Sequence, residues 1–329
     1  MANLATTYMG LNLRNPIIVG SSGLTSSVEN IKELEESGAG AVVLKSLFEE
    51  QIRFEINKTM KQAESHNSYY PEAQDYISHY SRVYHIDNYL KLISDCKNAV
   101  SIPITASINC VSAEEWTAFA KRIEEAGADA LELNIFILPA DPNLSGEQNE
   151  QVYFDIIDQV KKQVSIPIAL KISYHFSGLA KTALKLSWAG AKGMVLFNRF
   201  YAPDINVDNL KVVPSNVFST PDEISISLRW VAMLSDRLYC DIAASTGVHD
   251  GKGLVKQLLA GAKAVQIAST LYKNGFGRIG EMLKYLENWM DKHAYKTTEE
   301  FTGKLSLKKA ENPAAWERVQ FMKHFAGIE

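Results

Sequence analysis

The segment Ala126-Gly127-Ala128-Asp129-Ala130-Leu131-Glu132-Leu133 decides the fold of this chain, because its pattern occurs three more times. Small residues around a glycine, followed by an apolar run, also stand at 37–44, 189–196 and 260–267. In each copy the glycine ends an amphipathic helical run and the apolar residues begin a short β-strand. Strands and helices that alternate at this spacing predict parallel βαβ units.

Further strand signals lie between these copies, such as Ser101-Ile102-Pro103-Ile104-Thr105 and Ser165-Ile166-Pro167-Ile168-Ala169. The expected strands lie near 16–19, 41–46, 103–109, 130–136, 167–173, 193–198, 240–245 and 264–269. About eight units predict a closed (β/α)8 barrel, that is, a TIM barrel of the α/β class. Such barrels carry their chemistry at the C-terminal ends of the strands, so these ends are where a site is expected.

The length and composition of the chain fit one such barrel. The chain has 329 residues, 46% of them hydrophobic, and we expect a single domain over residues 1–329, because these barrels pass about 250 residues as one unit. One long excursion, 48–85, follows the second strand and another, 199–220, follows the sixth; loops of that length are usually functional. Residues 6–13 are expected to form a hairpin that closes the bottom of the barrel.

Charge and motif content argue against several classes of function. The net charge of −4 comes with no basic stripe, so we expect no nucleic-acid partner. No apolar run is long enough for a membrane span and no signal-peptide pattern follows Met1, which favours a cytoplasmic protein. Three cysteines without a CxxC pair and seven histidines without HxH or HExxH spacing predict no metal site.

Polar side chains end strands that are otherwise apolar. In chain order they are Ser21, Ser22, Lys45, Ser46, Ser107, Asn109, Asn134, Lys171 and Asn198. One such residue alone often marks only the point where a strand reaches solvent. Several that converge on one barrel mouth predict a binding site, and because a buried ammonium without a partner is costly, we expect an anionic or carbonyl-rich ligand.

The seventh and eighth strands end in small residues, Ser245-Thr246-Gly247 and Ala268-Ser269. Such residues let backbone N–H groups approach a phosphate at a helix N-terminus, and barrels often bind phosphate at these two loops. Ordinary turn chemistry is the alternative explanation.

The segment Gly275-Phe276-Gly277-Arg278-Ile279-Gly280 has the GxGxxG spacing of a dinucleotide site. Residues 271–274 separate it from its strand, however, and no βαβ unit follows it. We therefore predict that it is the entry into a helix over 279–291.

At these residues the chain resembles the dihydroorotate dehydrogenase family, FMN-dependent oxidoreductases of pyrimidine biosynthesis built on a (β/α)8 barrel. The likeness spans essentially the whole length and is strongest to the class 1 branch. The motifs that carry it are Asn15-Pro16, Gly20-Ser21-Ser22-Gly23, Leu44-Lys45-Ser46, Asn67-Ser68, Glu132-Leu133-Asn134, Leu170-Lys171-Ile172-Ser173, Asn198, Thr246-Gly247-Val248, Gln266-Ile267-Ala268-Ser269 and Phe301-Thr302-Gly303-Lys304-Leu305.

The resemblance implies FMN, with its phosphate at strands seven and eight and its ring over the barrel mouth. Lys171 would contact the edge of the flavin where negative charge accumulates on reduction. Catalytic roles, in which side chains hold a small-molecule substrate against the flavin, are implied for Lys45, Asn67, Asn134 and Asn198. Cofactor-binding roles are implied for Ser21, Ser22, Lys45, Ser46, Asn109, Asn134, Lys171, Thr246, Gly247, Ala268 and Ser269. The family also suggests a homodimer.

The chain departs from the family at the catalytic base. Where the family has a Cys or Ser that removes a substrate proton, this chain has Ile137 or Leu138, neither of which accepts one. Loss of a general base typically costs about 10²–10⁴ in rate. Candidate replacements on the first excursion are His66, Ser68, Tyr69 and Tyr70. Arg199 stands where the family has a serine and would add positive charge near the substrate.

Three functions stay open from the sequence. The first is oxidation of dihydroorotate with a base from residues 66–70. The second is a flavin-dependent dehydrogenase or reductase of another unsaturated acid or ring, favoured by the apolar residues 136–138 and by Arg199, which would hold a carboxylate. The third is a flavin-binding protein without turnover. A phosphate-binding barrel without flavin would be colourless, and the sequence does not identify the electron acceptor or an iron–sulfur partner subunit.

Overall fold

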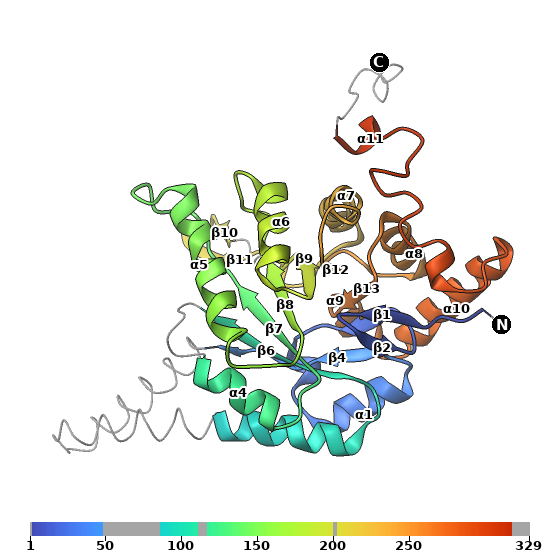
Figure 1. The fold of residues 1–329 in the computed structure, drawn as a ribbon, viewed down its shortest axis with the longest axis horizontal. Helices are drawn as coiled ribbons and strands as arrows, with labels where there is room; N and C mark the ends of the chain where they lie inside the picture. Colours follow the sequence, from blue (N-terminus) through green and yellow to red (C-terminus); the bar gives the residue numbers. More distant parts are fainter. Residues whose placement is uncertain (1, 49–85, 111–116, 200–202, 318–329) are drawn as a thin grey trace.

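The structure is a computed structural model that describes residues 2–48, 86–110, 117–199 and 203–317. A closed parallel barrel forms its centre (Figure 1), and the predicted (β/α)8 barrel is thereby confirmed. Its strands are β3 (Ile17–Val19), β4 (Ala41–Val43), β6 (Ile104–Cys110), β7 (Ala130–Ile135), β8 (Ile168–Ile172), β9 (Gly193–Leu196), β12 (Asp241–Ser245) and β13 (Ala264–Ile267). The pairing of β4 with β6 closes the barrel, and β5 (Leu47–Phe48) adds a short pairing to β6.

Helices surround the barrel, and most of them follow a strand directly (Figure 1). They are α1 (Val28–Glu36), helical residues 86–99, α4 (Thr117–Glu125), α5 (Gly146–Val160), α6 (Leu179–Ala189), α7 (Ile224–Leu234), α8 (Gly251–Ala260), α9 (Ser269–Asn274) and α10 (Arg278–Lys292). Ser27 caps α1 through a hydrogen bond from the Asn30 N–H, as its residue type predicts. Helix α10 covers the predicted 279–291, so the GxGxxG segment is a helix entry.

The glycines of the fourfold repeat end helices, as predicted. Gly38, Gly127, Gly190 and Gly261 have φ angles of 105°, 97°, 122° and 118°. This left-handed region costs a residue with a Cβ about 1–2 kcal/mol, so glycine is favoured there. At Gly261 a Cβ would also lie 2.4 Å from the Ser235 side chain, which explains why the turn tolerates no larger residue.

The barrel strands are buried on both faces, which explains their continuous apolar runs. The expected hairpin at the bottom of the barrel is present as β1 (Thr6–Tyr8) and β2 (Leu11–Leu13). Tyr8, Met9 and Leu13 are buried against a layer of small and branched side chains inside the barrel. The hairpin therefore fills one end of the barrel and leaves the other end for a site.

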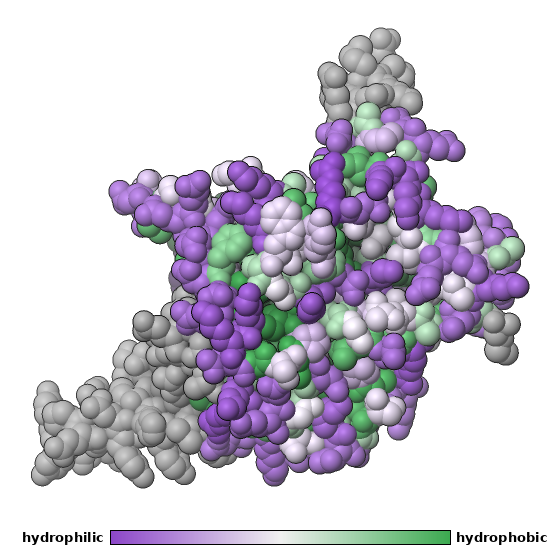
Figure 2. Space-filling model, viewed as in Figure 1, coloured by the Kyte–Doolittle hydropathy of each residue, from purple (hydrophilic) through white to green (hydrophobic). Residues whose placement is uncertain are grey.

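The second excursion contains a two-stranded antiparallel hairpin, β10 (Pro203–Asn206) and β11 (Lys211–Pro214). Short 3-10 turns, η1 (Gly23–Thr25), η2 (Pro221–Glu223) and η3 (Thr298–Glu300), and the helix α11 (Ala314–Glu317) complete the described elements. The first excursion lies almost entirely outside the described residues. Hydrophilic residues cover most of the face in Figure 2, and within the described ranges none of the helices is long and apolar enough to cross a membrane.

Candidate functional site

A cavity of about 440 Å³ opens at the C-terminal ends of the barrel strands. Its walls come from the loops after β3, β9, β12 and β13 and from the end of the second excursion. The predicted site residues that line it are Ser21, Ser22, Lys171, Asn198, Thr246, Gly247, Ala268 and Ser269. Residues that lie up to about 250 positions apart in the sequence thus meet at one barrel mouth, as this fold predicts.

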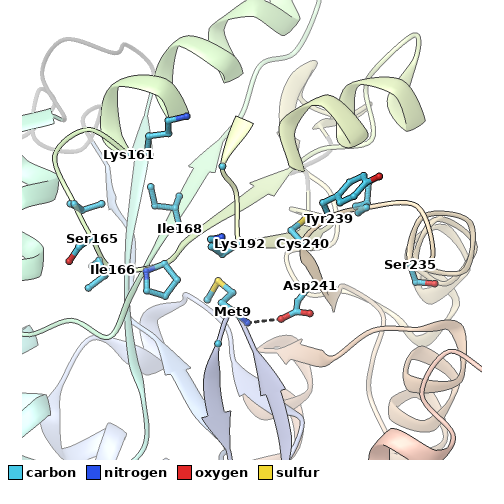
Figure 3. Close-up of a pocket in the computed structure, with 15 residues that line it drawn as sticks. Met9, Lys161, Ser165, Ile166, Ile168, Lys192, Ser235, Tyr239, Cys240 and Asp241 are labelled. Carbon is cyan, nitrogen blue, oxygen red and sulfur yellow. Dashed lines mark hydrogen bonds between the residues drawn. The ribbon is translucent and has the colours of Figure 1, made fainter. Parts of the chain in front are cut away.

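A larger hollow of about 690 Å³ lies at the opposite end of the barrel, beside Met9 and the segments that precede β8, β9 and β12 (Figure 3). Its polar groups serve the fold: Asp241 accepts a hydrogen bond from the Met9 N–H at 2.8 Å, and Lys161 donates to the Ala189 carbonyl at 2.9 Å. Burial raises the pKa of Cys240 to about 12, so its thiol is not a nucleophile at neutral pH. The cavity at the strand C-termini is therefore the candidate site.

Lys171 is held at the floor of this cavity by a buried polar network. Its Nζ donates to Gln266 Oε1 at 2.9 Å, and Gln266 Nε2 donates to Glu132 Oε2 at 2.5 Å. The Lys171 ammonium and Glu132 Oε1 are 3.6 Å apart. Below them, burial and then the charge of Glu132 raise the pKa of Tyr8 well above its usual range. The network places one cation at the cavity and one anion beneath it.

A row of amide side chains continues from Lys171 across the neighbouring strands. The parallel register pairs Lys171 with Asn134 on β7, and Asn134 with Asn109 on β6. Asn198, just after β9, donates from Nδ2 to Asn134 Oδ1 at 2.8 Å. Since paired residues of parallel strands point to the same face, these groups form a polar surface on one side of the barrel mouth.

A chain of hydroxyl groups lies beside this row. The Oγ atoms of Ser21 and Ser46 are 2.9 Å apart, and those of Ser46 and Ser107 are 2.7 Å apart. Tyr89 accepts from the Ser107 N–H at 2.8 Å and donates to the Ser107 carbonyl at 3.0 Å. Ser46 is buried in this chain and fixes the wall, while Ser21 and Ser22 line the cavity. Lys45 follows β4 with an exposed side chain and is not part of the cavity lining.

The loop after β12 brings backbone to the cavity in a strained conformation. Thr246 and Gly247 have φ angles of 72° and 79°, a region that a β-branched residue rarely adopts. Thr246 Oγ1 donates to the Phe197 carbonyl at 3.1 Å, which holds this turn against the end of β9. A Cβ on Gly247 would lie 2.1 Å from the Ile224 backbone nitrogen, so only glycine fits here.

The two loops predicted to bind a phosphate differ in one respect from the sequence prediction. Helix α8 does not offer an open N-terminus, because Asp250 caps it by accepting from the Gly253 N–H at 2.7 Å. The second loop fits better: α9 begins at Ser269, directly after Ala268, and among the described residues no side chain caps it. The small residues of the two loops, rather than the α8 terminus, line the cavity.

A hydrogen-bonded serine–histidine pair, which the sequence did not indicate, lies beside these loops. Ser219 is buried, lines the cavity and shares a hydrogen bond of 2.9 Å with His249 Nε2. Burial, followed by the charge of Lys273, lowers the pKa of His249. Lys273 Nζ donates to the Ser219 carbonyl at 2.7 Å, and the Ser219 N–H donates to Ser269 Oγ at 3.1 Å. The end of the second excursion is thus tied to the loop after β13.

Arg199 does not offer the free positive charge expected from the sequence. Its Nε donates to Glu223 at 2.9 Å, and its two terminal nitrogens donate to the carbonyls of Val217 and Asn216 at 2.8 and 2.7 Å. The charge is paired and the donors hold the second excursion in place. Arg199 also lines the cavity, so its contact with a substrate carboxylate stays a prediction.

The segment that replaces the family's base is apolar in the structure as well. Phe136 and Leu138 are exposed, while Ile137 is half-buried. Ile137 lines a small cavity of about 30 Å³ together with Glu150, Tyr153 and His175. Burial raises the pKa of Tyr153 to about 12, and Glu150 accepts a hydrogen bond from Thr182. The proposed replacement bases at 66–70, and Asn67, lie outside the described residues.

Sequence reasoning missed Gln266 and Glu132 as site residues, as well as Ser219 and His249. A signal existed for the first two, since each is a polar residue in the middle of an apolar strand. No such signal marks Ser219 and His249 in the sequence, because both lie in loops. Across the described ranges, His, Cys, Asp and Glu side chains form no cluster that could hold a metal ion.

Comparison with known proteins agrees with this architecture. Residues 3–290 match the family described as dihydroorotate dehydrogenase. The catalytic subunit of dihydroorotate dehydrogenase B (NAD(+)) from Thermoplasma volcanium is 29% identical over 312 residues, covering 92% of this chain and 98% of the relative. The subunits of that name from Pyrococcus abyssi and Methanocaldococcus jannaschii are 25% and 26% identical, covering 93% and 83% of this chain and 99% and 89% of theirs.

Proposed function

The chain belongs to the dihydroorotate dehydrogenase family, and from that premise we propose that it oxidises dihydroorotate to orotate in pyrimidine biosynthesis, with FMN as its cofactor. It is then an oxidoreductase acting on a CH–CH bond. The observation that carries this proposal is the polar surface of Lys171, Asn134 and Asn198 beside two small-residue loops at one barrel mouth.

The residues at the mouth fit FMN. The cavity volume of about 440 Å³ lies within the range of ligand sites. The loops at Thr246-Gly247 and Ala268-Ser269 suit a phosphate, and the buried ammonium of Lys171 suits an edge that becomes negative on reduction. Bound there, FMN would supply the hydride acceptor that the oxidation requires.

The chain's own residues would bind and orient the substrate. Asn134 and Asn198 already share a hydrogen bond, so each keeps further amide donors and acceptors for a ring that carries carbonyl and N–H groups. The roles predicted for Lys45 and Asn67 stay predictions, since the Lys45 side chain is exposed outside the cavity lining and Asn67 lies outside the described residues. Orientation of this kind supplies much of the rate, because it removes the entropy cost of bringing two reactants together.

The proton that leaves the substrate needs an acceptor other than Ile137 or Leu138. The residues at 66–70 remain the predicted source. In the part of the chain that the structure describes, His175 is a further candidate, because it lines the small cavity behind Ile137. Of the other two titratable groups there, Tyr153 stays protonated and Glu150 is already bound to Thr182.

A homodimer is part of the proposal, and the hairpin of the second excursion supports it. On one face of β10 and β11, the register places Ile205 opposite Val212, with Pro203 opposite Pro214. Ile205, Val212 and the turn residue Leu210 are 65%, 75% and 86% exposed. Apolar side chains gathered on one exposed face are typical of a surface that another protein covers, and a second copy of this chain is the partner that we propose.

A second function is favoured by one observation. Phe136 and Leu138 expose apolar side chains beside the position of the absent base, which would suit a less polar unsaturated ring or acid. Turnover with an artificial electron acceptor separates the two: orotate formed from dihydroorotate supports the first function. Turnover of other unsaturated substrates alone, with none of dihydroorotate, supports the second.

A further inference from the structure

Gln266 reaches across the barrel to contact charged residues on strands that are not its neighbours. It lies on β13, whereas Glu132 and Lys171 lie on β7 and β8, with β12 and β9 between. All three side chains are buried, with exposures of 3%, 1% and 7%. Both the oxygen and the nitrogen of the Gln266 amide form hydrogen bonds. Loss of either bond would leave a buried polar group without a partner, so the side chain is held firmly in this position.

The network holds the two charges as an ion pair without a direct hydrogen bond between them. The Glu132 carboxylate accepts from the Gln266 amide at 2.5 Å, while its nearest approach to the Lys171 ammonium is 3.6 Å, too long for a hydrogen bond. The ammonium instead donates to the amide oxygen of Gln266 at 2.9 Å. An ammonium has three donors, and Lys171 lines the candidate site, so it retains donors for a ligand there.

We propose that Gln266 is a positioning residue that holds the Lys171 ammonium toward the cavity and keeps it from donating a direct hydrogen bond to Glu132. The inference rests on the proposed function, in which a flavin ring lies over Lys171. With Gln266 in place, a cation faces the flavin edge that becomes negative on reduction. Without it, the ammonium would turn to donate directly to Glu132 and move away from the cavity, and its field at the flavin would fall because that field decreases with distance.

A purely structural role for Gln266, in which it only fills the barrel, predicts something different. Replacing it would then lower stability and leave the chemistry of the bound flavin unchanged. Sulfite separates the two roles, because it adds to a bound flavin and leaves negative charge on the ring. Its dissociation constant therefore reports the positive field at the flavin without any turnover.

The experiment is a double-mutant cycle on the FMN-loaded protein with the variants Gln266→Met, Lys171→Met and both together. We expect each single variant to weaken sulfite binding about 10-fold or more, the size of one lost hydrogen bond to a charged group. The double variant should be no weaker than Lys171→Met alone, because Gln266 acts through Lys171. Unchanged sulfite binding in Gln266→Met, or additive losses in the double variant, would overturn the inference.

Two further variants keep the result interpretable. Gln257→Met is the matched control and should leave sulfite binding unchanged. Gln257 is also a buried glutamine, but it lies on α8 and bonds to Ser227.

If Gln266→Met does not fold, Glu132→Gln tests the same network. Loss of the buried anion should tighten sulfite binding, and weaker or equal binding contradicts the inference. A wild-type protein that binds no FMN overturns the proposed function and this inference together, whereas FMN binding with an unaffected Gln266→Met overturns the inference alone.

Discussion

Asn198 donates a hydrogen bond of 2.8 Å to Asn134, although 64 positions separate the two residues in the chain. The bond connects the end of β9 to β7 across the strand that carries Lys171. It therefore fixes two amide groups over the buried ammonium before any ligand arrives. Preorganisation of this kind lowers the entropy cost of binding.

Asn198→Ala should raise KM for dihydroorotate about 10-fold and change FMN affinity less, since it removes hydrogen bonds to the substrate directly and affects Asn134 only through their shared hydrogen bond. Steady-state kinetics and a fluorescence titration with FMN measure the two effects. Asn209→Ala, in the exposed turn of the hairpin, is the control and should alter neither quantity. Equal losses of FMN and substrate affinity in Asn198→Ala would argue against a substrate role.

Ile137→Cys should raise the rate of dihydroorotate oxidation, because it supplies a proton acceptor where the family has one; a gain of about 10² or more is expected if the base limits the reaction. Leu138→Cys is the matched neighbour, and it is exposed whereas Ile137 is half-buried. If His175 is the native acceptor, His175→Asn lowers the activity of the wild type but not that of Ile137→Cys. If neither cysteine variant oxidises dihydroorotate faster than the wild type, the substrate pocket differs from that of the family in more than the missing base.

Gly247→Ala should both destabilise the fold and weaken FMN binding. Its Cβ would lie 2.1 Å from the Ile224 nitrogen at a φ of 79°, and a left-handed alanine alone costs about 1–3 kcal/mol. Urea unfolding and FMN titration measure the two losses. Gly277→Ala meets nothing within 4 Å and serves as the control; weaker FMN binding in that variant would revive a role for the GxGxxG segment.

Stability should fall as the pH drops below about 6.5, and His249 should account for part of the loss. Its pKa is lowered in the folded state, so as the pH falls the unfolded chain takes up the proton first. The contribution of His249 to the free energy of unfolding is complete above the pKa that His249 has in the unfolded chain. It is lost as the pH falls toward the pKa that His249 has in the folded protein, by at most about 1.4 kcal/mol per pH unit. His249→Gln should flatten the pH dependence of urea unfolding. Parallel curves for wild type and His249→Gln would contradict this prediction.

Val212→Asp should convert the expected homodimer to a monomer, because it places a carboxylate in the apolar face of the hairpin. Analytical ultracentrifugation measures the change. Asn206→Asp, on the opposite face of the same hairpin, is the control and should leave the dimer intact. A wild-type protein that is monomeric at micromolar concentration would refute the dimer.

The barrel was predictable from sequence because its signals are local. Apolar runs buried on both faces, the glycines with positive φ and the Ser27 cap act within a few residues, so each strand and helix is visible in its own segment. The positions of Lys171, Asn134 and Asn198 at one mouth then followed from the rule that parallel strands end on the same side.

The network beneath the site was not predictable, because it depends on contacts across the barrel. Gln266 bonds to residues 95 and 134 positions away, and no local pattern encodes that distance. Arg199 illustrates the same limit: its charge suggested a ligand, yet Glu223 and two carbonyl groups of the excursion bind it. The apolar residues in 203–214 are visible in the sequence, but only the register shows which of them share a face, and only the structure shows that this face is exposed.

The absorption spectrum of the FMN-loaded protein, recorded without oxygen before and after dihydroorotate is added, tests the central claim most directly. We expect the flavin band near about 450 nm to lose its intensity as the substrate reduces the cofactor, with orotate formed in equal amount. A spectrum that stays unchanged over hours with dihydroorotate, while a chemical reductant bleaches it at once, would contradict the proposed function.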